Sequence, residues 1–162
     1  MIPTHMKISE YIMRPDLKVP VGVMDKIQQC HANPMSYVRQ KLGVPIIVSK
    51  SSGYRPLEHE IDNGRDGTSE HVFHLQDRPG SEKGLGAADY TTLNDGFYDM
   101  VRLISKLTNY SRIAFYTDTD TQFVHCDYRY FGSKKQFFLV RRNAWKQTGL
   151  TSVLEAIKEI II

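Results

Sequence analysis

Three short segments that lie far apart in the sequence each carry a good zinc ligand. They are Ser69-Glu70-His71, Gly86-Ala87-Ala88-Asp89 and Phe123-Val124-His125-Cys126-Asp127. A fold that uses all three must bring them to one place. Two imidazoles and one carboxylate beside small or apolar residues are what a catalytic zinc site needs, because such a site uses three protein ligands and leaves a fourth position for water. The pattern predicts a zinc hydrolase.

The cysteine content and the composition narrow the alternatives. A structural zinc site would prefer four ligands, mostly cysteine, and this chain has only Cys30 and Cys126. A length of 162 residues suits one compact domain. The formal charge of +3 comes without a Lys/Arg tract that alternates with aromatic residues, so no nucleic-acid partner is expected.

The N-terminal residues and the apolar runs indicate where the protein is made. Residues 1–13 lack a continuous apolar region and carry Lys7 and Glu10, so no signal peptide is expected. The longest apolar runs are far shorter than a membrane span, and no membrane partner is expected. We expect a monomer that is synthesised in the cytoplasm and stays there unless it is released.

The pattern along the chain predicts an α+β domain over residues 21–162, preceded by a polar, proline-punctuated N-terminal arm over residues 1–20. Helices and strands do not alternate strictly, which favours α+β over a parallel α/β sheet. Asn33 and Pro34 predict the N-cap and first position of a helix that ends at Gly43. Helices are expected over 21–30, 35–42, 96–107 and 151–160, strands over 45–49, 87–91, 112–116, 122–128 and 136–140, and a loop region over 58–85.

His125 and Asp127 are two positions apart on a predicted strand, so both side chains point to one face of the sheet. Val124 and Cys126 then face the core, where Cys126 acts as a small buried hydrophobe rather than a ligand. An isolated strand histidine is more often a hydrogen-bonded core residue. The neighbouring Asp127 and the other two segments favour a ligand role for His125.

His71 and His74 lie three positions apart, which is also the spacing of two ligands on one helical turn, but one of the two is enough. His71 is preferred because Ser69 places a supporting hydroxyl beside it. Asp89 follows small residues that let its strand approach a metal closely, and a buried carboxylate needs a partner that a cation can supply. The alternative for Asp89 is a turn cap with Thr91 or Thr92.

Arg55 lies in a tight turn, Ser52-Gly53-Tyr54-Arg55-Pro56, that follows a buried strand. A guanidinium in such a position can bind a substrate carboxylate through two hydrogen bonds or stabilise a developing oxyanion. The alternative is an ordinary surface arginine.

These motifs, taken in order, resemble the zinc D-Ala-D-Ala carboxypeptidase and L-alanyl-D-glutamate endopeptidase family. The matching pieces are the Ser-Gly-Tyr-Arg-Pro turn, Ser-Glu-His, Gly-Ala-Ala-Asp and Phe-Val-His-Cys-Asp. Ala114-Phe115-Tyr116 and Trp145 fit the order of one branch of that family. The resemblance covers roughly residues 20–145.

The resemblance implies a small α+β fold akin to the hedgehog signalling domain, with an antiparallel sheet that carries the metal and helices packed on one side. It implies a Zn²⁺ cofactor held by His71, Asp89 and His125, with Arg55, Tyr54 and Ser69 at the substrate. Members of the family cut peptides that contain D-amino acids in bacterial peptidoglycan, and many are phage lysis enzymes. A chain without a signal peptide fits a phage endolysin made in the host cytoplasm and released through a holin to act at the cell wall.

Two features depart from the family pattern. The segment between His71 and Asp89 is longer than usual, which we interpret as a loop insertion and which keeps His74 as an alternative ligand; loop-closure cost grows only slowly with length. Gln122 stands where much of the family has the acidic general base. Asp118, Asp120 and Asp127 are the remaining candidates for that role, and we favour Asp120 and Asp127.

The leading hypothesis is therefore metal-assisted peptide hydrolysis, in which a carboxylate moves the proton. A non-catalytic binding or structural protein that keeps zinc for stability is the main rival, because Gln122 cannot take a proton. A zinc-free regulatory domain is a third alternative. The residues do not select the bond that is cut, or decide between carboxypeptidase and endopeptidase activity.

Overall fold

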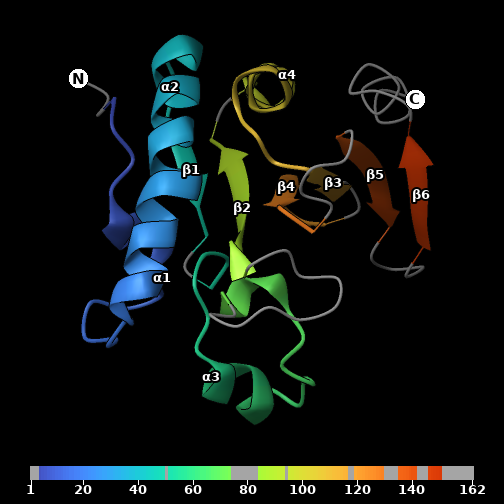
Figure 1. The fold of residues 1–162 in the computed structure, drawn as a ribbon. Coiled ribbons are helices and arrows are strands. Elements are labelled where there is room, and N and C mark those ends of the chain that lie inside the picture. The colour runs from blue at the N-terminus through green and yellow to red at the C-terminus, as the bar shows by residue number, and fades with distance from the viewer. Residues whose placement is uncertain are drawn as a thin grey trace.

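The computed structural model describes residues 4–49, 51–73, 84–93, 95–116, 119–129, 135–141 and 146–150. It is a small α+β domain, as predicted, in which helices and one sheet follow each other without strict alternation (Figure 1). The helical segments are η1 (Ile8–Tyr11), α1 (Val21–Lys26), η2 (Ile27–Ala32), α2 (Asn33–Leu42), α3 (Leu57–Asp62), η3 (Glu70–Val72) and α4 (Phe97–Leu107). The strands are β1 (Ile46–Val48), β2 (Ala87–Thr92), β3 (Arg112–Tyr116), β4 (Phe123–Asp127), β5 (Gln136–Arg141) and β6 (Lys146–Leu150).

The sheet has six strands in the order β1-β2-β4-β3-β5-β6. The prediction of an antiparallel sheet is wrong at one place, because β3 and β5 pair in parallel. The reason is topological. β4 folds back on β3 as an antiparallel neighbour, and β5 then reverses direction again but pairs with the other edge of β3. Strands that alternate in direction along the chain therefore meet in parallel at this pair.

One face of the sheet carries the hydrophobic core. Ala88 and Tyr90 of β2, Ile113 and Phe115 of β3, and Val124 and Cys126 of β4 are all buried there. The predicted orientation of Val124 and Cys126 is confirmed. Helices α1, η2, α2 and α4 supply the other side of this core, including Ile27, Met35, Val38, Met100 and Ile104. The opposite face of β2 and β4 is therefore left for polar side chains.

The helical region before β1 differs from the prediction. Asn33 does not cap a new helix, because its backbone is helical (φ −62°, ψ −56°) and its N–H donates to the carbonyl of Gln28. The π-helical turn η2 joins α1 to α2 without a break. Its wider turn accommodates Pro34, which has no N–H to donate. Gly43 ends α2 as predicted, in the left-handed region at φ 71°.

Two residues of the predicted N-terminal arm pack into the core. Met6 and Tyr11 are buried, and the guanidinium of Arg39 on α2 donates to the carbonyl of His5 and pairs with Glu10 at 2.5 Å. The backbone N–H of Tyr54 donates to the carbonyl of Tyr11 over 2.7 Å. The backbone at Tyr11 thus supports the turn that carries Arg55.

A buried polar network lies beneath the sheet. The Tyr110 hydroxyl contacts His31 Nδ1 at 2.8 Å and the Tyr90 hydroxyl at 2.6 Å, and Tyr90 in turn donates to Tyr11 over 3.3 Å. His31 Nε2 donates to the carbonyl of Leu85, just before β2. Burial lowers the pKa of His31 to about 4, so the imidazole is neutral at pH 7 and the tautomer is set by these partners.

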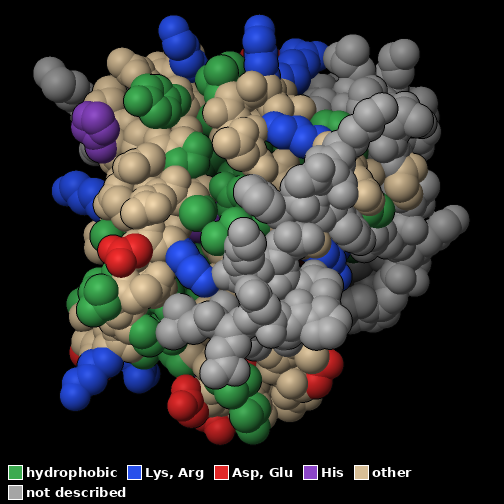
Figure 2. Space-filling model, viewed as in Figure 1, with side chains coloured by type: hydrophobic (Ala, Val, Ile, Leu, Met, Phe, Trp, Pro, Cys, Tyr) green, Lys and Arg blue, Asp and Glu red, His purple; other side chains and the backbone are tan. Residues whose placement is uncertain are grey.

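Helix α3 lies almost wholly within the region 58–85 that the sequence pattern predicts to be a loop, so the prediction missed this helix. It lies apart from the other helices, at the lower end of the view in Figure 1. Acidic side chains gather at that end of the molecule in Figure 2, while Lys and Arg side chains are spread over other parts of this face.

Within the described residues, no helix is both long and apolar enough to cross a membrane. The helix expected over 151–160, Trp145 and the predicted loop insertion lie outside the described residues.

Candidate metal centre

The two strands β2 and β4 place Asp89 and His125 side by side. These residues are direct register partners, so their side chains leave the sheet next to each other on the face opposite the core. His71 comes from η3, where the Ser69 hydroxyl accepts a hydrogen bond from the His71 N–H over 3.3 Å. The structure therefore brings together the three ligands that the sequence predicts.

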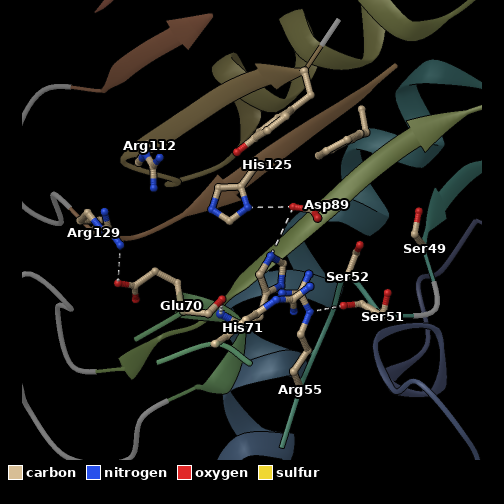
Figure 3. A pocket seen from close by; sticks show the side chains of 14 residues that line it. Ser49, Ser51, Ser52, Arg55, Glu70, His71, Asp89, Arg112, His125 and Arg129 are labelled. Atoms are coloured by element: carbon tan, nitrogen blue, oxygen red, sulfur yellow. Dashed lines mark hydrogen bonds and ion pairs between the residues drawn. The ribbon is translucent and has the colours of Figure 1, made fainter. Parts of the chain in front are cut away.

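The three side chains converge closely enough to share one ion (Figure 3). His125 Nδ1 lies 2.8 Å from Asp89 Oδ1, and His71 Nε2 lies 3.4 Å from the same oxygen. Within the part of the chain that is described, this is the one group of three or more His, Cys, Asp or Glu side chains close enough to hold a metal ion. Two imidazoles and one carboxylate suit zinc, whereas calcium and magnesium require mainly oxygen ligands.

Outer hydrogen bonds fix which nitrogen of each imidazole can bind the ion. His71 Nδ1 lies 2.9 Å from the carbonyl of Gly53 and must donate its proton there, which leaves Nε2 as the ligand atom. His125 Nε2 lies 2.9 Å from Asp127 Oδ2, which leaves Nδ1 facing Asp89. Such partners set the tautomer and orientation of metal-binding histidines.

The electrostatics of the group follow from burial and from these pairs. Burial alone would lower the pKa of His125, but the hydrogen bonds to Asp127 and Asp89 raise this pKa to about 9. For Asp89, burial would raise the pKa, but the two imidazoles hold it well below its usual range. Burial lowers the pKa of His71. An ion bound at His125 Nδ1 would replace the proton at that atom.

Asp127 is a positioning residue for His125 in this geometry. It is fully buried, and its Oδ2 also accepts from Arg112 Nη1 over 3.0 Å while Oδ1 accepts the backbone N–H of Arg129. Burial would raise its pKa, but His125 and Arg112 lower this pKa to about 2. A carboxylate with so many donors and so low a pKa is a poor proton acceptor, so the expected role of Asp127 as general base does not suit its surroundings.

Asp127→Asn should weaken zinc binding by roughly 10- to 100-fold, the usual effect of losing an outer partner of a metal-bound histidine. The amide can still accept through its oxygen, but it no longer carries the charge that holds the His125 tautomer. Competition with a chromophoric chelator measures the change. Asp99→Asn on the exposed side of α4 is the matched control. Equal zinc affinity in the two variants would contradict the positioning role.

The turn around Gly53 is hydrogen-bonded both to the metal group, as we name the set His71, Asp89 and His125, and to the N-terminal residues. Asp89 N–H donates to the carbonyl of Ser52 over 2.8 Å, and Arg55 N–H donates to the carbonyl of His71 over 2.8 Å. A Cβ at Gly53 would lie only 2.2 Å from the backbone oxygen of Tyr11. The close approach of the two backbones requires glycine here.

Gly53→Ala should therefore lower both stability and zinc affinity. Displacing one backbone from the other costs roughly 1–3 kcal/mol, and the shift moves the carbonyl that orients His71. Thermal unfolding with and without zinc measures both effects. Gly149→Ala, where an added Cβ meets nothing within 4 Å, is the control. An unchanged melting temperature for Gly53→Ala would show that the turn is not locked.

A cavity of about 420 Å³ opens over the metal group. Arg55 and Ser69 line it, as the sequence predicts for substrate-contacting residues. Tyr54 does not line it. This side chain is buried in the core and packs edge-on against Phe73, and its backbone is held by Tyr11 and Ile12. Asp120 is exposed in the turn between β3 and β4 and does not line the cavity either. His74 and Asp118 lie outside the described residues.

Four charged residues of the cavity wall were missed by sequence reasoning: Arg65, Glu70, Arg112 and Arg129. Two of these four residues could have been found from their positions in the sequence. Arg129 continues the two-residue spacing of His125 and Asp127, and Glu70 is the direct neighbour of His71. No pattern links Arg65 or Arg112 to the motifs, since only the fold brings them to the cavity.

No family model, curated protein or solved structure matches this chain. The functional argument therefore depends on the geometry of the site and on the motifs themselves.

Proposed function

We propose that the protein is a zinc metallopeptidase that hydrolyses peptide bonds in bacterial peptidoglycan, as a carboxypeptidase or an endopeptidase. The observation that carries the proposal is the His71–Asp89–His125 group at the base of an open cavity that Arg55 also lines. Three ligands leave room for substrate or water, as in catalytic rather than structural zinc sites. The ordered motifs that resemble the D-Ala-D-Ala carboxypeptidase and L-alanyl-D-glutamate endopeptidase family supply the substrate class and the hedgehog-like fold assignment.

The proposal assigns metal binding to three residues and substrate binding to Arg55. His71 Nε2, His125 Nδ1 and the Asp89 carboxylate would hold the ion, and zinc, when bound, polarises a carbonyl and makes water nucleophilic near neutral pH. Arg55 is held by the carbonyl of Ser51 and, over 3.3 Å, by Glu60, so its guanidinium is fixed at the cavity wall. A fixed guanidinium can orient a substrate carboxylate or stabilise charge that develops on the carbonyl oxygen.

Glu70 is the best-placed proton carrier among the described residues. Besides the ligand Asp89, it is the one described carboxylate that lines the cavity. It directly precedes His71 in η3, and its carboxylate lies 3.4 Å from Arg129 Nη2. A carboxylate at the cavity wall can take a proton from water and return it to the leaving amine. Glu70 thus fills the role that Gln122 leaves vacant.

Metal analysis combined with peptidoglycan digestion tests the proposed function. Purified protein should carry one zinc per chain, and incubation with peptidoglycan should release new amino groups, which mass spectrometry of the fragments assigns to a bond. Treatment with a chelator should stop the release, and added zinc should restore it. Protein without stoichiometric zinc that releases no amines would overturn the proposal.

A zinc-stabilised binding or structural protein is the second candidate, and Gln122 at the position of the usual acid favours it. Under this alternative, chelation lowers the melting temperature while peptidoglycan stays intact. If the protein is an enzyme, chelation lowers the melting temperature and also stops the hydrolysis of peptidoglycan. We further propose a phage setting, in which the protein reaches the cell wall after release from the host cytoplasm.

A further inference from the structure

Four arginines surround the metal group at the cavity wall. They come from separate parts of the chain: Arg55 from the turn after β1, Arg65 from the segment after α3, Arg112 from β3 and Arg129 from the residues after β4. A bound zinc ion already adds two positive charges to this place. A cavity with so many guanidinium groups favours an anionic ligand.

The arginines stand on two flanks of the metal group. Four neighbouring strands of the sheet have the order β1-β2-β4-β3, and the two middle strands carry Asp89 and His125. Arg55 lies in the turn after β1, on one side of this pair, and Arg112 lies on β3, on the other side. Figure 3 shows the same arrangement, with Arg112 and Arg129 beyond His125 and with Arg55 near Ser51 and Ser52 on the side of Asp89. A peptide bound across the metal group would meet arginine on both sides of its reacting carbonyl.

The flank with Arg55 has more positive than negative charge. Arg55 and Arg65 share a single carboxylate, that of Glu60, at 3.3 Å and 2.7 Å. Glu60 is buried with only 1% of its side chain exposed. Two guanidinium groups and one carboxylate leave one positive charge that faces the cavity. One substrate carboxylate would balance it.

The other flank carries Arg129, and only some of the N–H groups of its guanidinium make hydrogen bonds within the described residues. Its side chain is 37% exposed and contacts Glu70 at 3.4 Å, which is too long for a strong charged hydrogen bond. Its Nε is buried and has no hydrogen-bond partner within the described part of the chain. Arg112 stands beside it, held by Asp127 at 3.0 Å and by the Phe138 ring at 5.6 Å. This flank can bind a second carboxylate through a bidentate pair.

The charge count of the whole site supports two anionic groups. The four arginines face four carboxylates at or behind the cavity wall: Glu60, Glu70, Asp89 and Asp127. These eight charges cancel, and both histidine ligands are neutral when they bind a metal. A divalent ion then leaves an excess of two positive charges, which a ligand with two carboxylates would neutralise.

We propose that the substrate carries one carboxylate on each side of the scissile bond, with Arg55 binding one and Arg129 the other. This inference rests on the proposed peptidase function and adds the specificity of its site. It selects wall bonds between two residues that each bear a free carboxylate over bonds with a neutral residue on one side.

Binding of matched peptide analogues tests the proposal. The probe is N-acetyl-D-glutamyl-D-alanine with a ketomethylene group in place of the scissile amide, so that no hydrolysis intervenes. Three companions replace the D-Glu side chain by D-Gln, the terminal carboxylate by an amide, or both. Titration calorimetry with the zinc-loaded protein should show that each lost carboxylate weakens binding by roughly 10- to 100-fold.

Variants assign each carboxylate to its arginine. Arg129→Gln should abolish the preference for one of the two carboxylates and leave the other preference intact, and Arg55→Gln should show the reverse. Arg129→Lys keeps the charge but loses the planar fork, so it should retain an intermediate preference. Arg102→Gln, an exposed position on α4, should bind all four probes like the unaltered protein. Thermal unfolding verifies that each variant is folded.

The outcomes separate this proposal from the proposed function. Release of amines from peptidoglycan together with unchanged probe preferences in Arg129→Gln would overturn the two-carboxylate proposal and leave the peptidase proposal standing. Carboxylate preferences that depend on the two arginines, without any hydrolysis of peptidoglycan, would uphold the binding site and overturn the peptidase. Equal affinity of the unaltered protein for all four probes would also overturn the two-carboxylate proposal.

Discussion

Replacing His125 with alanine is expected to remove stoichiometric zinc and hydrolytic activity together. His125 Nδ1 is one of the three proposed zinc donors, and the buried carboxylate of Asp127 orients this ring from its other nitrogen. With two ligands left, the loss of zinc affinity should exceed the roughly 10- to 100-fold that follows removal of an outer partner. Metal analysis after dialysis and amine release from peptidoglycan measure the two effects.

The same substitution at an exposed histidine provides the control. His5→Ala removes an exposed imidazole and should leave zinc content and activity unchanged. One zinc per chain in His125→Ala would exclude this residue as a ligand. Loss of zinc and of thermal stability, in a protein whose unaltered form never releases amines, would instead favour the zinc-stabilised binding protein.

Replacing Glu70 with glutamine should lower kcat by roughly 100- to 10,000-fold and leave the zinc content at one per chain. The glutamine keeps the shape of the side chain but cannot take a proton from water. Amine release under substrate saturation measures kcat, and metal analysis shows that the ligand group is intact. Glu58→Gln, at an exposed glutamate on α3, should behave like the unaltered protein.

Asp120 provides a second comparison for the proton carrier. If Asp120→Asn lowered kcat while Glu70→Gln did not, the sequence-based choice of Asp120 would be right and the role of Glu70 would be wrong. The exposure of Asp120 in the β3–β4 turn, away from the cavity lining, is the physical reason for the opposite expectation.

The metal group could be predicted from the sequence because its rules are local. Strand alternation places His125 on the face opposite Cys126, and small residues before Asp89 mark a strand that can approach a neighbour. Those two patterns suffice to orient both ligands, and the structure adds that the two strands are adjacent and that the residues are register partners. His71 was preferred over His74 because Ser69 stands beside it, and in the structure Ser69 caps the short helical turn that carries His71.

The rest of the site depends on contacts between distant segments. Tyr54 reads as a turn residue beside Arg55, but the backbone of Tyr11 draws it into the core. Arg129 could be found from its two-residue spacing after His125 and Asp127, whereas no motif singles out Arg112, which the pairing of β3 with β4 brings to the cavity. The parallel pairing of β3 with β5 and the continuous helix through η2 are likewise decided by packing. Local patterns cannot specify such partners.

The network that joins Tyr11, His31, Tyr90 and Tyr110 has a consequence for the order of folding. His31 and Tyr110 are 79 positions apart, as are Tyr11 and Tyr90. During synthesis, the N-terminal residues and the first helices therefore wait for their polar partners until most of the chain has left the ribosome. Contacts of such large sequence separation slow folding, because the chain must close long loops before any of them is made. The early helices are thus exposed to aggregation on the nascent chain until β2 and the residues after α4 arrive to cover them.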